Sequence, residues 1–353
     1  MSGPKRTNAL IAGVVAVCVA AGVLHFADVE PVVVFLVSAA ALAGLAWVIG
    51  VATEAVGAHF GPALTGLLQS TLGNLPELFV VLFALGAGEV VVAQTSILGS
   101  LFANALLVLG LAIVAGSVAA DDGVMRFRAR LPNDTATLLL LAVFIIVILG
   151  LSDTVGDRAS RHVVAISAVG AVCLLVVYAL WLWSYLRSDA REPALEGGAH
   201  GPFPFGIGIA VLAVAGVGAA LVSDWFVDAL DPAVDALGIS KAFTGLVIVA
   251  IAGNAVENLV GITLAAKGRS DLAISVVKNS VAQIAVFLFP ALVLLSLFFA
   301  DRLTFVLEPV YIGALVLTAI AVWQITGDGE AVAFEGWALV AIYIVLSVLT
   351  FYE

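Results

Sequence analysis

The pattern Gly-Asn-x-x-Glu occurs twice in this chain, at residues 73–77 and 253–257, with the second copy 180 positions after the first. Both copies lie within long apolar runs, so Glu77 and Glu257 are surrounded in sequence by hydrophobic residues. A carboxylate at the centre of a membrane-spanning helix costs about 2.5 kcal/mol or more, so an acid found there usually belongs to an ion or substrate path. Glu77 and Glu257 are therefore the primary candidates for a site that binds a metal cation or protons.

The polar residues near these glutamates are oxygen donors. Asn74 and Asn254 each precede a glutamate by three positions, a spacing that places both side chains on one face of a helix. Further hydroxyl and amide side chains follow in the next apolar runs: Ser96, Ser100 and Asn104 after the first copy, and Ser280 and Gln283 after the second. Carboxylates with hard oxygen ligands suit Ca²⁺, which takes six to eight oxygens. No histidine or cysteine joins them, as zinc or a soft metal would require.

The serines and asparagines also fit a second role, because small polar residues join helices in any membrane bundle. For Asn74 and Asn254 the sequence favours the binding site. For Ser96 and Asn104 both roles stay open.

Two carboxylates also suggest how transport is coupled. One Ca²⁺ ion or two protons neutralise the pair, whereas an empty, doubly ionised site is costly to bury. Only loaded states then reorient readily, so we expect antiport by alternating access. The stoichiometry stays open because interacting carboxylates titrate as a pair.

The composition predicts the elements that hold these residues. Of 353 residues, 63% are hydrophobic and 11% are charged, against about 25% charged in an average soluble domain. This excludes a soluble enzyme, a disordered chain and a coiled coil, and the apolar runs lack the alternation of an outer-membrane barrel. The net charge of −11 provides no basic footprint for nucleic acid. We expect an all-α polytopic membrane protein in contact with lipid, without a cofactor and of unknown oligomeric state.

Polar punctuation divides the sequence into about eleven transmembrane helices. The predicted spans are 9–27, 32–57, 62–87, 90–118, 135–151, 161–187, 206–230, 241–265, 271–299, 304–325 and 332–351. A cleaved signal peptide is the alternative for the first span, because Lys5 and Arg6 precede it.

The two halves of the chain form an internal repeat. Ser100 and Ser280 follow the two pentapeptides at equal spacing, and Thr65-Gly66-Leu67 recurs as Thr244-Gly245-Leu246. Each half holds five spans, an odd number, so the halves have opposite orientations, as in many transporters. The predicted units are an N-terminal transmembrane helix (1–30), a first five-helix repeat (31–187), a cytoplasmic linker (188–204) and a second, inverted five-helix repeat (205–353).

Lysine and arginine residues in the short loops predict the orientation. With the N-terminus in the cytoplasm, nine basic residues near the loops are cytoplasmic and four lie outside. The C-terminus is then outside. The Ala-, Val- and Gly-rich composition favours the cytoplasmic (inner) membrane of a prokaryote.

Three further charged residues fall near the predicted site. Glu54 and Asp224 occupy matching places near the ends of the second and seventh spans, either along access routes for the ion or as interfacial acids facing water. Lys278 directly precedes the second group of oxygen donors. It either points away from the site, reaching the membrane interface or pairing with Asp271, or places its ammonium near the ion as a modulating charge.

GNLPE with residues 94–104, and GNAVE with the stretch NSVAQIA (279–285), resemble the cation/proton exchanger family of the calcium/cation antiporter superfamily. The resemblance covers about residues 40–350. It implies one helix plus two inverted sets of five, and exchange of Ca²⁺ for H⁺ at Glu77 and Glu257. It also implies a set of residues beside those glutamates: Asn74, Asn254, Ser100, Ser280 and Gln283.

Departures from the family pattern leave the counter-ion open. Asn279-Ser280-Val281 stands where the family usually has Gly-Ser-Ser, and Pro76 resembles the sodium/calcium exchanger branch. A Na⁺/Ca²⁺ or Na⁺(K⁺)/H⁺ exchanger on the same fold is therefore the alternative. A cation channel is less favoured, because channels usually build carboxylate rings by oligomeric symmetry. No nucleophile–base or HExxH pattern predicts an enzyme.

Overall fold

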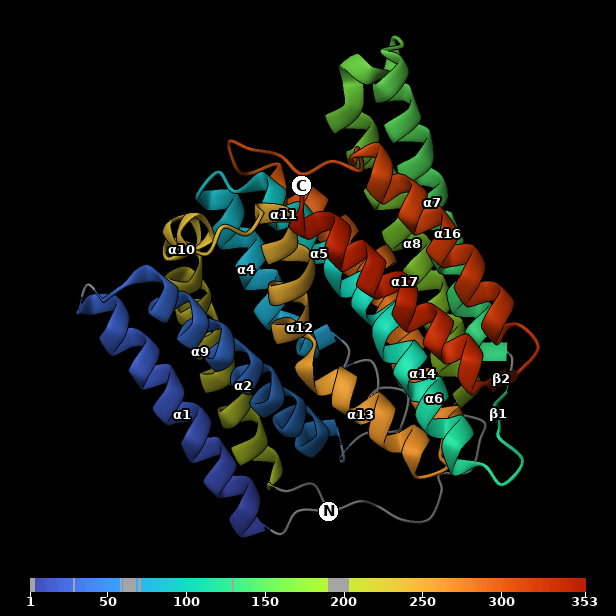
Figure 1. Ribbon diagram of the computed structural model, residues 1–353, viewed down its shortest axis with the longest axis horizontal. Coiled ribbons are helices and arrows are strands. Elements are labelled where there is room, and N and C mark those ends of the chain that lie inside the picture. Colours follow the sequence, from blue (N-terminus) through green and yellow to red (C-terminus); the bar gives the residue numbers. More distant parts are fainter. Residues whose placement is uncertain are drawn as a thin grey trace.

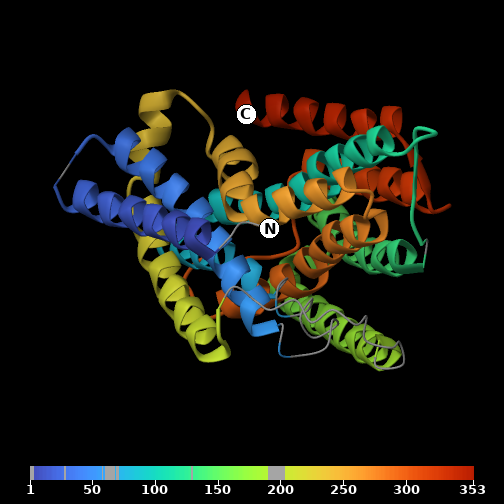
Figure 2. The ribbon, with the colours of Figure 1, turned by 90° about the horizontal axis from the view of Figure 1, so that it is seen from below.

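The computed structural model describes residues 4–353 except 28, 58, 60–67, 69–70, 129 and 190–202. The side chains of residues 255–258 also lie outside the described part. Nearly all of the described chain is helical, and the helices run side by side as an elongated bundle (Figures 1 and 2). The predicted all-α polytopic membrane protein is confirmed.

Seven helices run without interruption. They are α1 (Pro4–Phe26), α2 (Pro31–Gly57), α7 (Arg130–Val155), α8 (Val163–Asp189), α9 (Phe205–Asp228), α16 (Pro309–Thr326) and α17 (Ala333–Phe351). In Figure 1, α1 lies along α2 and α9, which pack against each other over much of their length. The rings of Phe35 and Phe226 stack there with centroids 4.7 Å apart.

Two further spans are each interrupted by a π-helical segment. In the first half, α5 (Val90–Phe102) continues through Ala103–Val108 into α6 (Leu109–Ala119). In the second half, α14 (Ser270–Gln283) continues through Ile284–Leu288 into α15 (Phe289–Ser296). These two spans are more buried than the others, so they form the centre of the bundle.

The remaining helices are short. They are α4 (Leu75–Gly86), α10 (Leu230–Leu237), α11 (Lys241–Phe243), the π-helical segment Thr244–Val249, α12 (Ala250–Gly253), α13 (Ala255–Ala266) and a 3₁₀ turn at Ala159–His162. The chain bends by 116° between α10 and the segment Lys241–Gly253. Among the described residues, nine helices are long and apolar enough to cross a membrane, or ten if this bent pair forms one span. The count of eleven stays a prediction, because the expected span 62–87 is described only in part.

The start of the tenth span differs from the prediction. The tenth span was expected from residue 304, but α16 begins at Pro309, which occupies the first turn, where its missing N–H costs nothing. The apolar residues before it belong to a non-helical stretch, in which Leu303 and Phe305 are fully buried. Apolar content here therefore reflects packing of a loop rather than helix.

A short antiparallel ribbon was not predicted. Strand β1 (Val124–Arg126) pairs with β2 (Glu330–Val332) at the end of the bundle opposite the C-terminus (Figure 1). Arg126 contacts Asp122 at 2.6 Å and Glu330 at 3.3 Å. The hydrogen bond from Arg126 holds the pKa of the Asp122 carboxyl below its usual range. The ribbon ties the loop after α6 to the loop after α16.

The loops assigned to opposite sides of the membrane lie at opposite ends of the bundle. The α4–α5 turn, α10 and the end of α17 lie near one end, and the β1–β2 ribbon lies near the other (Figure 1). This arrangement agrees with the predicted grouping of loops. Which end faces the cytoplasm stays a prediction.

Candidate functional site

Both pentapeptides interrupt a helix at their asparagine. Asn74 (φ −87°, ψ 7°) directly precedes α4, and Asn254 (φ −103°, ψ 14°) separates α12 from α13. The expectation that Asn and Glu share one continuous helix face is therefore wrong. Asparagine competes with the helical backbone for hydrogen bonds, and Pro76 cannot donate to the carbonyl of Leu72. Broken helices of this kind expose polar backbone groups at the membrane midplane, where transporters bind their substrates.

Asn254 connects the two halves through a buried amide cluster. Its Nδ2 donates to the hydroxyl oxygen of Ser100 at 2.7 Å, and its Oδ1 accepts from Nδ2 of Asn104 at 3.0 Å. All three side chains are buried, and Ser100 and Asn104 are fully so. The structure thus brings three of the predicted site residues into contact, and their role in binding a cation stays a prediction.

Glu77 lies directly against the second pentapeptide. Its side chain is 1% exposed, and its Cβ is 3.7 Å from the position that a Cβ at Gly253 would occupy. Glu77 belongs to the first turn of α4, where the positive end of the helix dipole favours a negative charge. Asn74, just before it, is also buried. The structure thus brings the first glutamate to the glycine of the second repeat.

The matching acid is less fully described. Glu257 lies in the first turn of α13, but its side chain is outside the described residues. Ser280 is fully buried on α14, and Gln283, at the end of the same helix, donates from Nε2 to the hydroxyl of Tyr178 at 2.9 Å. Tyr178 on α8 was not predicted as a partner of Gln283, because its neighbours in the sequence are apolar and give no sign of a polar contact.

Ser96 differs from the other predicted donors. It is fully buried, but its hydroxyl donates to the carbonyl of Ala93 in its own helix at 3.0 Å. Asn104 takes part in the amide cluster instead. Of the two residues whose role the sequence left open, Asn104 therefore joins the two halves, while the hydrogen bond of Ser96 stays within α5.

The π-helical segments that follow α5 and α14 begin at nearly matching places in the two halves. Asn104 is the second residue of Ala103–Val108, and Gln283 directly precedes Ile284–Leu288. A π turn inserts an extra residue into a helix and is frequent at functional sites. The sequence offered no signal for it, since both stretches are as apolar as their neighbours.

Two glycines allow α5 to cross the segment Thr244–Val249 backbone to backbone. A Cβ at Gly99 would overlap the carbonyl of Leu246, and a Cβ at Gly245 would overlap the hydroxyl of Thr95. Gly245 belongs to the triplet that the sequence singled out as repeated. The close crossing holds the helix that carries Ser100 against the helix that leads to Asn254.

The two matched acids have different surroundings. Glu54 on α2 is exposed, whereas Asp224 on α9 is half-buried and lines a cavity of about 360 Å³. The rest of the lining comes from Val227 and Asp228, from the end of α4 with Leu82 and Phe83, and from Phe299. Asp224 therefore faces an open space beside the helix that carries Glu77.

Lys278 occupies neither of the two outward positions that the sequence suggested. It is 1% exposed, so it does not reach the membrane interface, and its amine donates to the hydroxyl of Thr326 on α16 at 3.1 Å. Asp271 is instead engaged by Arg128, whose backbone N–H donates to it at 2.7 Å. The alternative that paired Lys278 with Asp271 is therefore wrong, because Asp271 binds the loop after β1 and Lys278 binds Thr326.

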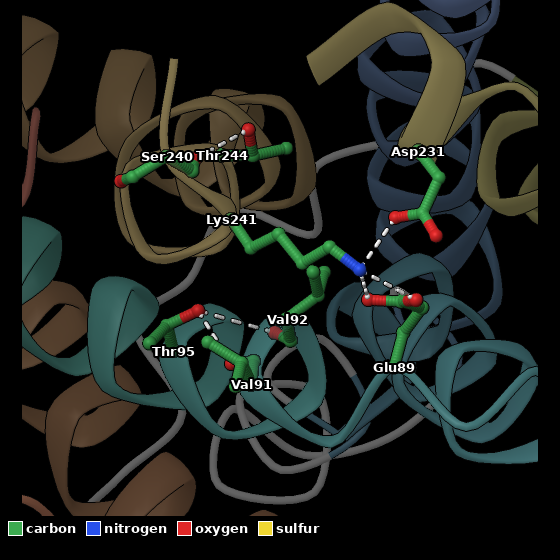
Figure 3. A network of polar contacts seen from close by, with 8 residues as sticks. All are labelled: Glu89, Val91, Val92, Thr95, Asp231, Ser240, Lys241 and Thr244. Carbon is green, nitrogen blue, oxygen red and sulfur yellow. Dashed lines mark hydrogen bonds and ion pairs between the residues drawn. The ribbon is translucent and has the colours of Figure 1, made fainter. Parts of the chain in front are cut away.

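A cluster of charges at the opposite end of the bundle from the ribbon also joins the two halves (Figure 3). The amine of Lys241 contacts both oxygens of Glu89 at 2.8 and 2.7 Å, and one oxygen of Asp231 at 2.7 Å. Glu89 lies in the α4–α5 turn, and Asp231 lies on α10. The cluster fixes the start of the broken helix against the first half.

The buried oxygen donors are of mixed kinds. In the part of the chain that the structure describes, no group of three or more His, Cys, Asp or Glu side chains forms a metal site. The buried set of Glu77, Asn104, Asn254 and Ser100 supplies one carboxylate with amide and hydroxyl oxygens. Such donors suit a hard cation such as Ca²⁺.

Comparison with known proteins decides the family. A family model described as sodium/calcium exchanger protein matches residues 30–186 and 207–352. The chain belongs to this family. The two matched stretches fall on either side of the predicted linker, so the exchanger match covers both halves.

Curated relatives of this exchanger are similar over nearly their whole length. A Ca²⁺/H⁺ antiporter of Aphanothece halophytica is 29% identical, covering 93% of this chain and 92% of the relative. A vacuolar calcium ion transporter of Schizosaccharomyces pombe is 33% identical, covering 90% and 79%. The predicted resemblance to cation/proton exchangers is thus confirmed. The chain is an integral membrane protein, and it has bacterial relatives.

Solved structures agree with the fold. The structure of native YfkE has a TM-score of 0.82 at 28% identity and covers 98% of this chain and 99% of that one. The H⁺/Ca²⁺ exchanger CAX has a TM-score of 0.73 at 14% identity, covering 99% and 93%, and supports the fold alone.

Proposed function

We propose that this exchanger moves Ca²⁺ across the membrane in exchange for H⁺. The proposal is supported by relatives named Ca²⁺/H⁺ antiporter. The observation that carries it is the buried contact of the second pentapeptide with the first half of the chain, in which Glu77 lies against Gly253 and Asn254 binds Ser100 of α5. A hard cation at this point would meet a carboxylate and neutral oxygens, and protons on the carboxylates would replace its charge.

In the proposed mechanism Glu77 and Glu257 bind either one Ca²⁺ or protons, and the loaded site alternates between the two sides. Asn74, Asn254, Ser100, Ser280 and Gln283 supply neutral oxygens or position the glutamates. Asp224 lies on the access route from the cavity beside α4, whereas exposed Glu54 belongs to the membrane interface. An empty site with two ionised carboxylates is costly to bury, which couples the two fluxes.

The predicted architecture belongs to this proposal. The five-helix units 31–187 and 205–353 are inverted repeats after an N-terminal helix, joined by the linker 188–204. Helix breaks at Asn74 and Asn254 and π-helical segments at equivalent places support this division. The N-terminus faces the cytoplasm, and the membrane is the inner membrane of a prokaryote.

A second candidate is exchange against Na⁺. It is favoured by the family model's description and by Pro76 within the first pentapeptide. Ca²⁺ uptake into proteoliposomes under separate H⁺, Na⁺ and K⁺ gradients distinguishes the two. Uptake driven by the H⁺ gradient alone supports the proposal, and uptake that requires a Na⁺ gradient contradicts it.

A further inference from the structure

Three buried amide oxygens have no hydrogen-bond partner among the described residues: Oδ1 of Asn279, and Oδ1 of Asn104 and Oε1 of Gln283 on two candidate site residues. The side chains of these two candidate site residues are 0% and 4% exposed. A buried polar atom without a partner is costly and usually marks a place that a ligand or ion completes. The oxygens of both candidate site residues are acceptors, which suits a cation.

Each amide is oriented through its own nitrogen. Nδ2 of Asn104 donates to the carbonyl of Ser100 and to Oδ1 of Asn254, both at 3.0 Å. Nε2 of Gln283 donates to the hydroxyl of Tyr178 at 2.9 Å. Because the nitrogen and oxygen of an amide point in different directions, a fixed nitrogen turns the oxygen away from its partner.

Tyr178 is a rigid partner for this purpose. It is 5% exposed, and its ring packs against Trp181 and Phe287 with centroids 5.8 and 5.5 Å away. Phe287 belongs to the π-helical segment that follows Gln283. The packed ring therefore holds the hydroxyl of Tyr178 in a fixed place, where it accepts the hydrogen bond from Gln283 Nε2.

We propose that Tyr178 is a positioning residue that orients the Gln283 amide so that its carbonyl oxygen faces the transported cation. This inference rests on the proposed function, because it names a residue that tunes the same site. An amide turned the other way would present its N–H groups, which repel a cation. Tyr178 therefore acts on cation affinity through Gln283 and does not touch the ion.

The test is a double-mutant cycle on the full-length protein in proteoliposomes, with Ca²⁺ uptake driven by an imposed H⁺ gradient. The variants are Tyr178→Phe, Gln283→Leu and the double variant. Loss of the hydroxyl frees the amide to turn, so Tyr178→Phe should raise KM for Ca²⁺ about three- to tenfold and leave the maximal rate nearly unchanged. In the double variant the KM should equal that of Gln283→Leu, because Tyr178 has nothing left to orient.

Tyr343→Phe is the matched control, since Tyr343 is a buried tyrosine on α17, and it should keep the wild-type KM. Tyr178→Phe removes one oxygen and keeps the ring, and a thermal melt of each purified variant establishes that it is folded.

Each outcome decides between the inference and the proposed function. A wild-type protein without H⁺-driven Ca²⁺ uptake contradicts the proposed function and removes the basis of the inference. If the wild type transports Ca²⁺ but Tyr178→Phe matches Tyr343→Phe, or its effect adds to that of Gln283→Leu, the inference alone is overturned.

Discussion

The amide nitrogen of Asn254 lies 2.7 Å from the hydroxyl oxygen of Ser100, although the two residues belong to different halves of the chain. Asn254 also accepts from Asn104, so one side chain joins the helix break in the second half to the span of the first half that carries Ser100 and Asn104. The site therefore depends on the docking of the two halves, and a change at Asn254 should affect both folding and binding.

Replacing Asn254 with alanine should remove one of the two acceptors of Asn104 Nδ2 and the donor to the buried Ser100 hydroxyl. We expect a loss of about 1–3 kcal/mol in stability, from the cost of unsatisfied buried groups, together with strongly reduced Ca²⁺ uptake. Thermal melting in detergent and vesicle uptake measure the two effects. Ser96→Ala is the control, because its hydroxyl bonds only within α5. Equal losses in both variants would argue against a special role for Asn254.

The crossing of α5 over Thr244–Val249 requires glycine at both contact points. Gly99→Val and Gly245→Val should each prevent the close approach and reduce the yield of folded protein, since added atoms overlap backbone or a buried hydroxyl. Gly216→Ala, where a Cβ meets nothing within 4 Å, should fold normally. Size-exclusion profiles provide the comparison. A well-folded Gly99→Val protein would show that the crossing can open without loss.

Lys278 and Thr326 should behave asymmetrically. Lys278→Met keeps the volume of the side chain and removes a buried polar group, so stability should be unchanged or higher. Thr326→Val leaves the buried amine without its acceptor and should cost about 1–3 kcal/mol. The double variant should recover most of that loss. Melting temperatures of the three proteins test this order, and a Lys278→Met protein less stable than Thr326→Val would contradict it.

The contacts of Lys241 with Glu89 and Asp231 should stabilise the packing of α10 and α11 against the α4–α5 turn. Lys241→Met leaves Glu89, which is 14% exposed, without its partner, whereas Asp231→Asn removes a contact at a more exposed carboxylate. We expect the free energy of unfolding of Lys241→Met to fall by about 1 kcal/mol, seen as a lower melting temperature, and a smaller change for Asp231→Asn. High salt should narrow the difference. Lys267→Met, at an exposed lysine of the other end, should be neutral; an equal loss there would contradict a specific role.

The chemical character of the site was predictable from the sequence, but its geometry was only partly so. Repeated spacing identified Asn254 and Ser100 as candidate site residues, each with a counterpart in the other half, and the structure places these two in contact. Apolar runs predicted the spans, because burial in lipid leaves a compositional signal. The π-helical segments leave no such signal, since they depend on tertiary packing rather than on residue type. The helix breaks at Asn74 and Asn254 were missed although asparagine is a weak helix former.

Long-range partners were the second limit. One alternative paired Lys278 with Asp271, but Lys278 contacts Thr326 and Asp271 contacts Arg128, both from distant segments. Tyr178 is separated from Gln283 by more than a hundred residues. Side chains such as these acquire their role only when the halves pack, which no spacing rule within one chain segment reveals.

The most direct test of the central claim is Ca²⁺ uptake into proteoliposomes driven by an imposed H⁺ gradient, with simultaneous measurement of H⁺ movement. The wild type should take up Ca²⁺ while H⁺ moves the other way, and Glu77→Gln and Glu257→Gln should each abolish both fluxes. Uptake that survives either substitution, or that proceeds without H⁺ countermovement, would contradict the account.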